Sequence, residues 1–142
     1  FLECAYFTPA AVRRASRRHG VETHSSYRYA RGTNPEAIPL AINRAAQLIQ
    51  QVAGGAIYQG THDVYPHPVE RPKIEIRLRD IDSRLGYGAD AVKFEDWMKR
   101  LGCEVERSSR AGAEPAWTVT PPSFRWDLSL DVDLVEEYAR LN

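Results

Sequence analysis

Apolar residues recur along this chain with two periods, one typical of helices and one typical of strands. The first helical stretch runs from Ala10 to His19. It is flanked by a capping residue, a proline suited to a first helical turn and a glycine suited to a helix end, namely Thr8, Pro9 and Gly20. The polar residues that follow, 21–31, are predicted to form a short strand and a turn.

A second helix is predicted to begin at Asn34-Pro35. Its apolar residues recur at intervals of three and four positions: Ile38, Ala41, Ile42, Ala45, Leu48, Ile49 and Val52. Gly54-Gly55 is expected to end this helix, and residues 56–65 are predicted as a strand.

Residues 66–72 contain three prolines, which neither a helix nor a central strand accommodates. We therefore place a linker there, between one domain at residues 1–65 and another at residues 73–142. Charge also changes near this point. Residues 1–71 hold 8 basic and 5 acidic side chains, and residues 72–142 hold 11 and 14. The net charge of zero therefore combines a basic first part of the chain with an acidic second part.

The second part has the clearest order of elements. Its pattern predicts strand, helix, helix, strand, strand and helix, at Lys73–Leu78, Arg79–Leu85, Asp90–Leu101, Cys103–Ser108, Ala116–Thr120 and Asp131–Leu141. A helical pair backed by a β-hairpin is close to a winged helix. The predicted fold class is α+β, with a partial α/β piece followed by this winged-helix-like domain.

Composition narrows the classes of protein further. The chain has 142 residues, 43% hydrophobic and 27% charged, so it is neither disordered nor collagen-like. Its apolar runs are far shorter than the roughly 20 residues that span a bilayer, so no membrane contact is expected. Two distant cysteines do not indicate a disulfide scaffold and favour a reduced, cytoplasmic protein. Because an apolar run begins at Phe1 without Met or a signal peptide, we expect a fragment of something larger.

Four carboxylates near the end form the most specific chemical pattern: Asp127, Asp133, Glu136 and Glu137. The last three stand at i, i+3 and i+4, so they can share a helix face. Carboxylate oxygens are ligands that Mg²⁺ prefers. Acidic residues in a first helical turn are equally explained by the helix dipole, with no metal. The spacing leaves both interpretations open.

Four arginines within residues 13–18 could contact phosphate or form a solvated helix face. His24-Ser25 has no third group to orient it, so a polar turn explains it better than a catalytic pair. No phosphate-binding glycine loop is present. We identify no catalytic residue.

Several motifs, in order, resemble one stretch of the bacterial phenylalanyl-tRNA synthetase beta subunit. They cover nearly the whole chain: Leu2–Phe7, Arg13–Gly20, Ser25–Pro35, Arg44–Ala46, Gly54-Gly55, Leu101–Val105, Pro121–Asp127 and Asp133–Arg140. The resemblance implies that residues 1–65 are the end of a B3/B4 domain, which in the family contains an editing site. It implies that residues 73–142 are a B5 domain, truncated at its C-terminus.

The resemblance also implies a magnesium site. In the family, four acidic positions bind Mg²⁺ shared with the alpha subunit, and they correspond to Asp127, Asp133, Glu136 and Glu137. The whole enzyme, with two alpha and two beta chains, uses ATP to attach phenylalanine to tRNA(Phe). ATP is not expected to bind here. This piece would serve structure and assembly, and alone it is expected to be inactive.

Two departures from the family pattern stand out. Ala30 replaces a glutamate, and Asn34 replaces an aspartate that an asparagine can still imitate as a helix cap. Two other functions remain open. One is a nucleic-acid-binding winged-helix module with a basic N-terminal helix, and the other is an interaction scaffold without metal.

Overall fold

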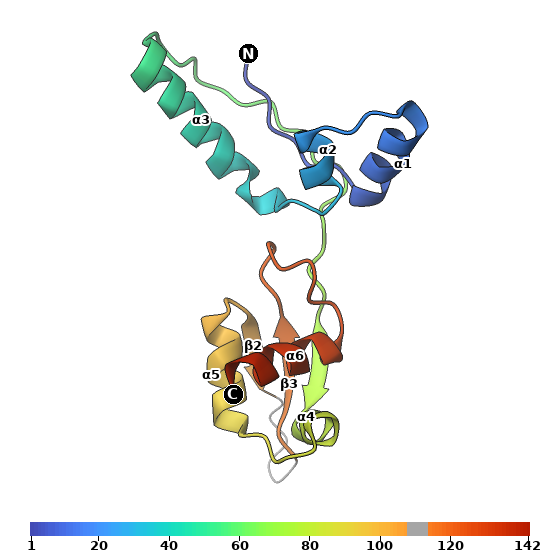
Figure 1. The fold of residues 1–142 in the computed structure, drawn as a ribbon. Helices are drawn as coiled ribbons and strands as arrows, with labels where there is room; N and C mark the ends of the chain where they lie inside the picture. Colours follow the sequence, from blue (N-terminus) through green and yellow to red (C-terminus); the bar gives the residue numbers. More distant parts are fainter. Residues whose placement is uncertain (108–113) are drawn as a thin grey trace. The chain divides into compact units, whose positions relative to one another are not determined.

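A computed structural model of the chain describes residues 1–107 and 114–142 (Figure 1). The chain divides into two compact units, Phe1–Val69 and Glu70–Asn142. Each unit has its own elements, and we describe them separately as unit 1 and unit 2. No helix within the described ranges is long and apolar enough to cross a membrane.

Unit 1 is built from helices alone: α1 Pro9–His19, α2 His24–Tyr29, the 3₁₀ helix η1 Pro35–Ala37 and α3 Ile38–Ala53. The predicted first helix is confirmed as α1. Gly20 ends it in a left-handed conformation with φ 63°, which side chains disfavour. The predicted second helix is confirmed as η1 and α3, and Asn34 Oδ1 caps η1 by accepting from the Glu36 N–H at 3.1 Å.

The prediction of a short strand within residues 21–31 is wrong, because the structure forms α2 there. Thr23 and Ser26 make a reciprocal cap. Thr23 Oγ1 accepts from the Ser26 N–H at 3.0 Å, and Ser26 Oγ accepts from the Thr23 N–H at 2.8 Å. These two bonds satisfy donors at the start of a helix, so hydroxyl residues that suggest a turn here begin a helical turn instead. His24-Ser25 is therefore the first turn of a capped helix.

The predicted strand at residues 56–65 is also wrong. Unit 1 is described in full, and it contains no strand with which this segment pairs. A strand needs a neighbour for its backbone groups, and alternating polarity alone does not supply one. Unit 1 also has no buried residue, and the apolar side chains of α3 are half-buried or exposed.

Unit 2 has the predicted order of elements: β1 Ile74–Arg77, α4 Leu78–Leu85, α5 Ala91–Arg100, β2 Glu104–Arg107, β3 Ala116–Thr120 and α6 Asp131–Leu141. Ser108, the last residue of one predicted strand, lies outside the described residues. The strands form an antiparallel sheet in the order β1-β3-β2, so β3 is central. Ile76 pairs with Trp117, and Val105 pairs with Val119.

The sheet and three helices enclose one core. Alternate residues of β1 and β3 point into it, because side chains alternate across a strand. In Figure 1, α6 crosses in front of the strands, and α5 lies beside them. The largest fully buried side chains of this core are Trp117, Tyr138, Phe94, Ile76, Ile81, Met98, Leu128, Leu134 and Val119. The α+β class is thereby confirmed for the chain.

The two cysteines carry free thiols. Cys103 is buried in the core of unit 2, and this burial raises the pKa of its thiol. Cys4 is half-buried in unit 1. Cys103 therefore behaves as a small apolar core residue.

Replacing Phe94 with alanine tests the core of unit 2, because Phe94 is fully buried. The lost transfer energy and the cavity left behind should lower the free energy of unfolding by about 3–5 kcal/mol. Phe124→Ala is the matched control, since Phe124 is 57% exposed, and it should change that free energy by about 0.5 kcal/mol. Urea titration followed by circular dichroism measures both, and equal losses would contradict the assigned core.

Candidate functional site

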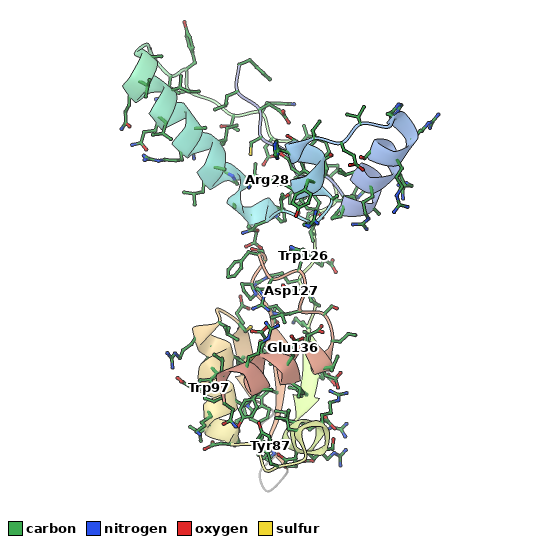
Figure 2. All side chains as sticks on the ribbon, in the orientation of Figure 1. Arg28, Tyr87, Trp97, Trp126, Asp127 and Glu136 are labelled. Atoms are coloured by element: carbon green, nitrogen blue, oxygen red, sulfur yellow. The ribbon has the colours of Figure 1, made fainter. Side chains whose placement is uncertain are left out.

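The four candidate carboxylates come from two neighbouring elements of unit 2. Asp127 lies in the loop between β3 and α6, and the other three lie on α6, as Figure 2 shows for Asp127 and Glu136. Leu134, Val135 and Tyr138 turn one side of α6 into the core. The exposure of each carboxylate therefore depends on its angular position around α6.

Arg125 holds two of the four carboxylates. Its Nε and Nη2 donate to Asp127 Oδ1 and Oδ2 at 2.9 and 2.7 Å. Its Nη2 and Nη1 also donate to Glu137 Oε1 and Oε2 at 2.9 and 3.5 Å. Two carboxylates thus share one guanidinium, whose planar fork suits paired oxygen acceptors.

This arrangement shifts the pKa values of Arg125 and Asp127. Hydrogen bonds to Asp127 and then to Glu137 raise the pKa of Arg125 above its usual range. The hydrogen bonds from Arg125 lower the pKa of Asp127. Glu137 is 9% exposed and is the single buried charged residue among those described. A buried carboxylate needs a partner, and Arg125 supplies it.

Asp133 does not contact Arg125 in this way but binds backbone N–H groups at the start of α6. Its Oδ2 accepts from the N–H groups of Ser129 and Leu130 at 2.9 and 2.8 Å. In return, the Asp133 N–H donates to the Leu130 carbonyl at 3.1 Å. These donors precede the first turn of α6, where backbone N–H groups lack partners within the helix. Asp133 therefore caps α6.

Glu136 points to solvent and pairs with Arg140 at 2.7 Å across one helical turn. Both side chains are more than half exposed, so this pair contributes little to stability. Arg140 Nη1 also lies 3.7 Å from Glu137 Oε1. The four carboxylates thus serve an internal ion pair, a helix cap and a surface pair.

In this arrangement the residues do not fit a resident divalent cation. In the described part of the chain, no three or more His, Cys, Asp or Glu side chains gather as a metal-binding group. A positive guanidinium already sits between Asp127 and Glu137, where a cation would need free oxygens. The structure brings two of the four predicted ligands together, and it does so around Arg125.

Sequence reasoning missed Arg125 as a member of this site. A signal was available: Glu137 lies between Leu134 and Tyr138 on the apolar side of the predicted α6. A carboxylate on a buried helix face requires a cationic partner. Arg140, three residues after Glu137, and Arg125, two residues before Asp127, were candidates in the chain.

Two protein families match the chain, one in each unit. Residues 1–54 match the B3/4 domain, and residues 74–142 match the tRNA synthetase B5 domain. The two matches occur in the order that the motifs predict.

Curated relatives match over nearly the whole chain. A protein of Bdellovibrio bacteriovorus named phenylalanine--tRNA ligase beta subunit is 51% identical over 142 residues, which are 100% of this chain and 17% of the relative. Proteins with the same name from Syntrophus aciditrophicus and Methylococcus capsulatus are each 41% identical over 99% of this chain and 17% of their own length. The chain thus spans about 17% of the length of these relatives.

Arg125→Met tests the internal ion pair. Without the Arg125 guanidinium, buried Glu137 keeps only the longer contact of 3.7 Å with exposed Arg140, so the free energy of unfolding should fall by about 3 kcal/mol. Arg140→Met is the matched control, because Arg140 is 66% exposed, and it should lower that free energy by less than about 1 kcal/mol. Denaturant titration measures both variants.

The double variant R125M/E137M completes the cycle. It should recover part of the stability that R125M loses, because no buried charge remains unpaired. Equal losses for R125M and R140M, or no recovery in the double variant, would contradict the internal role of Arg125.

Proposed function

The chain belongs to the phenylalanine--tRNA ligase beta subunit family, and we propose that it serves as a structural and assembly segment of such a subunit. The observation that supports this most is the succession of a B3/4 match and a B5 match along a chain that is 51% identical to one such subunit. The whole enzyme would use ATP to attach phenylalanine to tRNA(Phe) in the cytoplasm. We assign no catalytic residue to this segment.

The partner in this proposal is the alpha subunit, because a beta subunit implies an alpha chain. In the assembly of two alpha and two beta chains, the alpha subunit would carry out the aminoacylation. Unit 2 offers a folded body for such docking, with Phe124, Trp126 and Leu130 exposed in the loop before α6. Exposed aromatic residues of this kind are enriched at protein interfaces.

The domain boundaries are also part of the proposal: residues 1–65, a linker at 66–72, and residues 73–142. Three prolines in the linker and the division of the chain between Val69 and Glu70 support it. The matched families end at residue 54 and begin at residue 74, on either side of the linker.

A nucleic-acid-binding winged helix is less well supported for unit 2. Its α5 carries Lys93, Lys99 and Arg100. The last two cations pair with Glu95 and Asp96 of the same helix at 2.6 and 3.9 Å. A recognition helix needs cations free for phosphate, and most of those on α5 have partners.

The magnesium site stays a prediction. For Asp127, Asp133, Glu136 and Glu137 to bind one ion shared with the alpha subunit, Arg125 would have to release two of them. Asp133 would have to release two backbone N–H groups as well. We propose that this exchange depends on the partner, and that Arg125 fills the cation position in the chain alone.

A chimeric subunit tests the proposed function. The matching segment of the Bdellovibrio bacteriovorus beta subunit is replaced by this chain and produced with its own alpha subunit. We expect an alpha–beta complex on size-exclusion chromatography and tRNA charging by the complex, because the segment would supply the same docking surfaces. A deletion of the segment serves as the control. Loss of the complex in the chimera, or an intact complex in the deletion, would refute the proposal.

Calorimetric titration of the chain with Mg²⁺ tests the role of Arg125 as the internal cation. Arg125→Gln should bind Mg²⁺ at least about tenfold more tightly than the unchanged chain, since two carboxylates lose their positive partner. Adding D133N should weaken this binding again.

Arg84→Gln is the control for this titration, because Arg84 pairs with Asp131, outside the four carboxylates. It should bind Mg²⁺ like the unchanged chain. If R125Q and R84Q bind Mg²⁺ equally, Arg125 does not compete with a cation for these carboxylates.

A further inference from the structure

The linker at residues 66–72 is unusual in how little of its backbone can rotate. A proline fixes its own φ at about −65° and confines the residue before it to extended conformations. The three prolines of the linker therefore restrict six residues: Tyr65, Pro66, His67, Pro68, Arg71 and Pro72. Val69 and Glu70 are not restricted in this way.

Val69 is held by unit 1. Its N–H donates to the hydroxyl oxygen of Tyr65 at 2.7 Å. This bond closes a loop of residues 65–69, in which the chain bends at Pro66 and His67. Because prolines already limit the backbone of this loop, closing it costs less conformational entropy than closing an unrestricted one. Unit 1 is therefore expected to stay ordered as far as Val69, which is also its last residue.

Arg71 is held by unit 2. Its Nη2 lies 2.9 Å from Glu104 Oε1, and the Arg71 side chain is 34% exposed. Glu104 is the first residue of β2 and pairs with Thr120 of the central strand β3, so the ion pair ties Arg71 to the sheet. A surface ion pair contributes at most about 1 kcal/mol, but here Pro72 restricts the backbone of Arg71 as well. Unit 2 is therefore expected to be ordered from Arg71 onward.

Glu70 lies between these two restrained residues. No proline follows it, and its side chain is exposed. Within the ranges 1–107 and 114–142, none of its atoms takes part in a hydrogen bond or an ion pair. Hinges in proteins are a few residues that absorb changes in φ and ψ between two ordered bodies. Glu70 fits this description, because the restraints on either side reach its direct neighbours.

We propose that Glu70 is a single-residue hinge about which unit 1 and unit 2 turn as separate bodies. The alternative is a linker in which all of residues 66–72 move. The bond between Tyr65 and Val69 and the ion pair between Arg71 and Glu104 argue against that alternative. The inference goes beyond the proposed function, and its test does not depend on that function.

Backbone ¹⁵N relaxation of the 142-residue chain tests the hinge, because it yields an order parameter for each N–H group. The order parameter of Glu70 should fall below about 0.6, the range of a flexible backbone. Those of Val69 and Arg71 should remain nearer to about 0.85, the value of a rigid backbone. An order parameter at Glu70 as high as theirs, or low values at all three residues, would overturn the proposal.

Two variants release one side of the hinge each. Glu104→Gln should lower the order parameter of Arg71, because the ion pair is lost. Glu106→Gln is the matched control, since Glu106 is exposed on the same strand and lacks an ion pair among the described residues, and it should leave Arg71 unchanged. Equal effects of E104Q and E106Q would contradict the role of Arg71.

Tyr65→Phe removes the hydroxyl that Val69 contacts, so it should lower the order parameter of Val69. Tyr58→Phe is its control, because Tyr58 is 94% exposed and accepts no hydrogen bond from the described residues, and it should leave Val69 unchanged. The same order parameter of Val69 in Y65F and Y58F would contradict the restraint on the side of unit 1.

Glu70→Pro tests the hinge directly. It places four prolines within residues 66–72, a composition that favours a stiff, extended spacer. The rotational correlation time of each unit, from the same relaxation data, should lengthen in E70P, because the chain then tumbles as one body. Glu70→Ala is the control and should keep the correlation times of the unchanged chain. Equal correlation times in E70P and E70A would overturn the proposal.

Discussion

The aromatic contacts of Tyr138 fix how α6 lies in unit 2. Its ring centroid is 6.0 Å from that of Phe94 and 5.1 Å from that of Trp97. Its hydroxyl accepts from the backbone N–H of Asp90 at 3.0 Å. Asp90 in turn caps α5 through bonds from Val92 and Lys93. One buried tyrosine therefore joins the last helix to the start of α5, and buried aromatic groups with a satisfied hydroxyl are strong anchors of this kind.

The rotation of α6 decides what its carboxylates can do. Successive helix residues are about 100° apart, so when Tyr138 points inward, Glu137 is drawn to the edge of the core and Glu136 to solvent. Asp133, Glu136 and Glu137 stand at i, i+3 and i+4, so they lie within a similar arc of α6. The boundary between the core and solvent crosses this arc. Equal spacing in sequence thus produces unequal environments. Glu137 needs Arg125, and Arg125 in turn holds Asp127 and the loop before α6.

The sequence predicted unit 2 well and unit 1 only in part, for physical reasons. In unit 2 the spacing of Phe94 and Met98 predicts a helix correctly, because the core on which this helix packs is formed by the same chain. Residues 56–65 show a strand-like pattern, but a strand depends on a distant partner that local pattern does not reveal. The helix α2 begins at one pair of hydrogen bonds between the side-chain hydroxyls and backbone N–H groups of Thr23 and Ser26. In a sequence, such hydroxyl residues are equally typical of a turn, so they do not reveal that a helix follows.

The pattern of four carboxylates was visible in the sequence, but the arginine that neutralises two of them was not identified. The two units also differ in whether their charged side chains form ion pairs. Several carboxylates of unit 2, Asp131 and Glu137 among them, obtain positive partners from their own unit, in these two cases Arg84 and Arg125. The arginines of α1 have no acidic side chain within ion-pair distance among the described residues, although the chain as a whole is neutral. Burial explains the difference: Glu137 must be paired for unit 2 to fold, whereas exposed Arg17 can remain solvated.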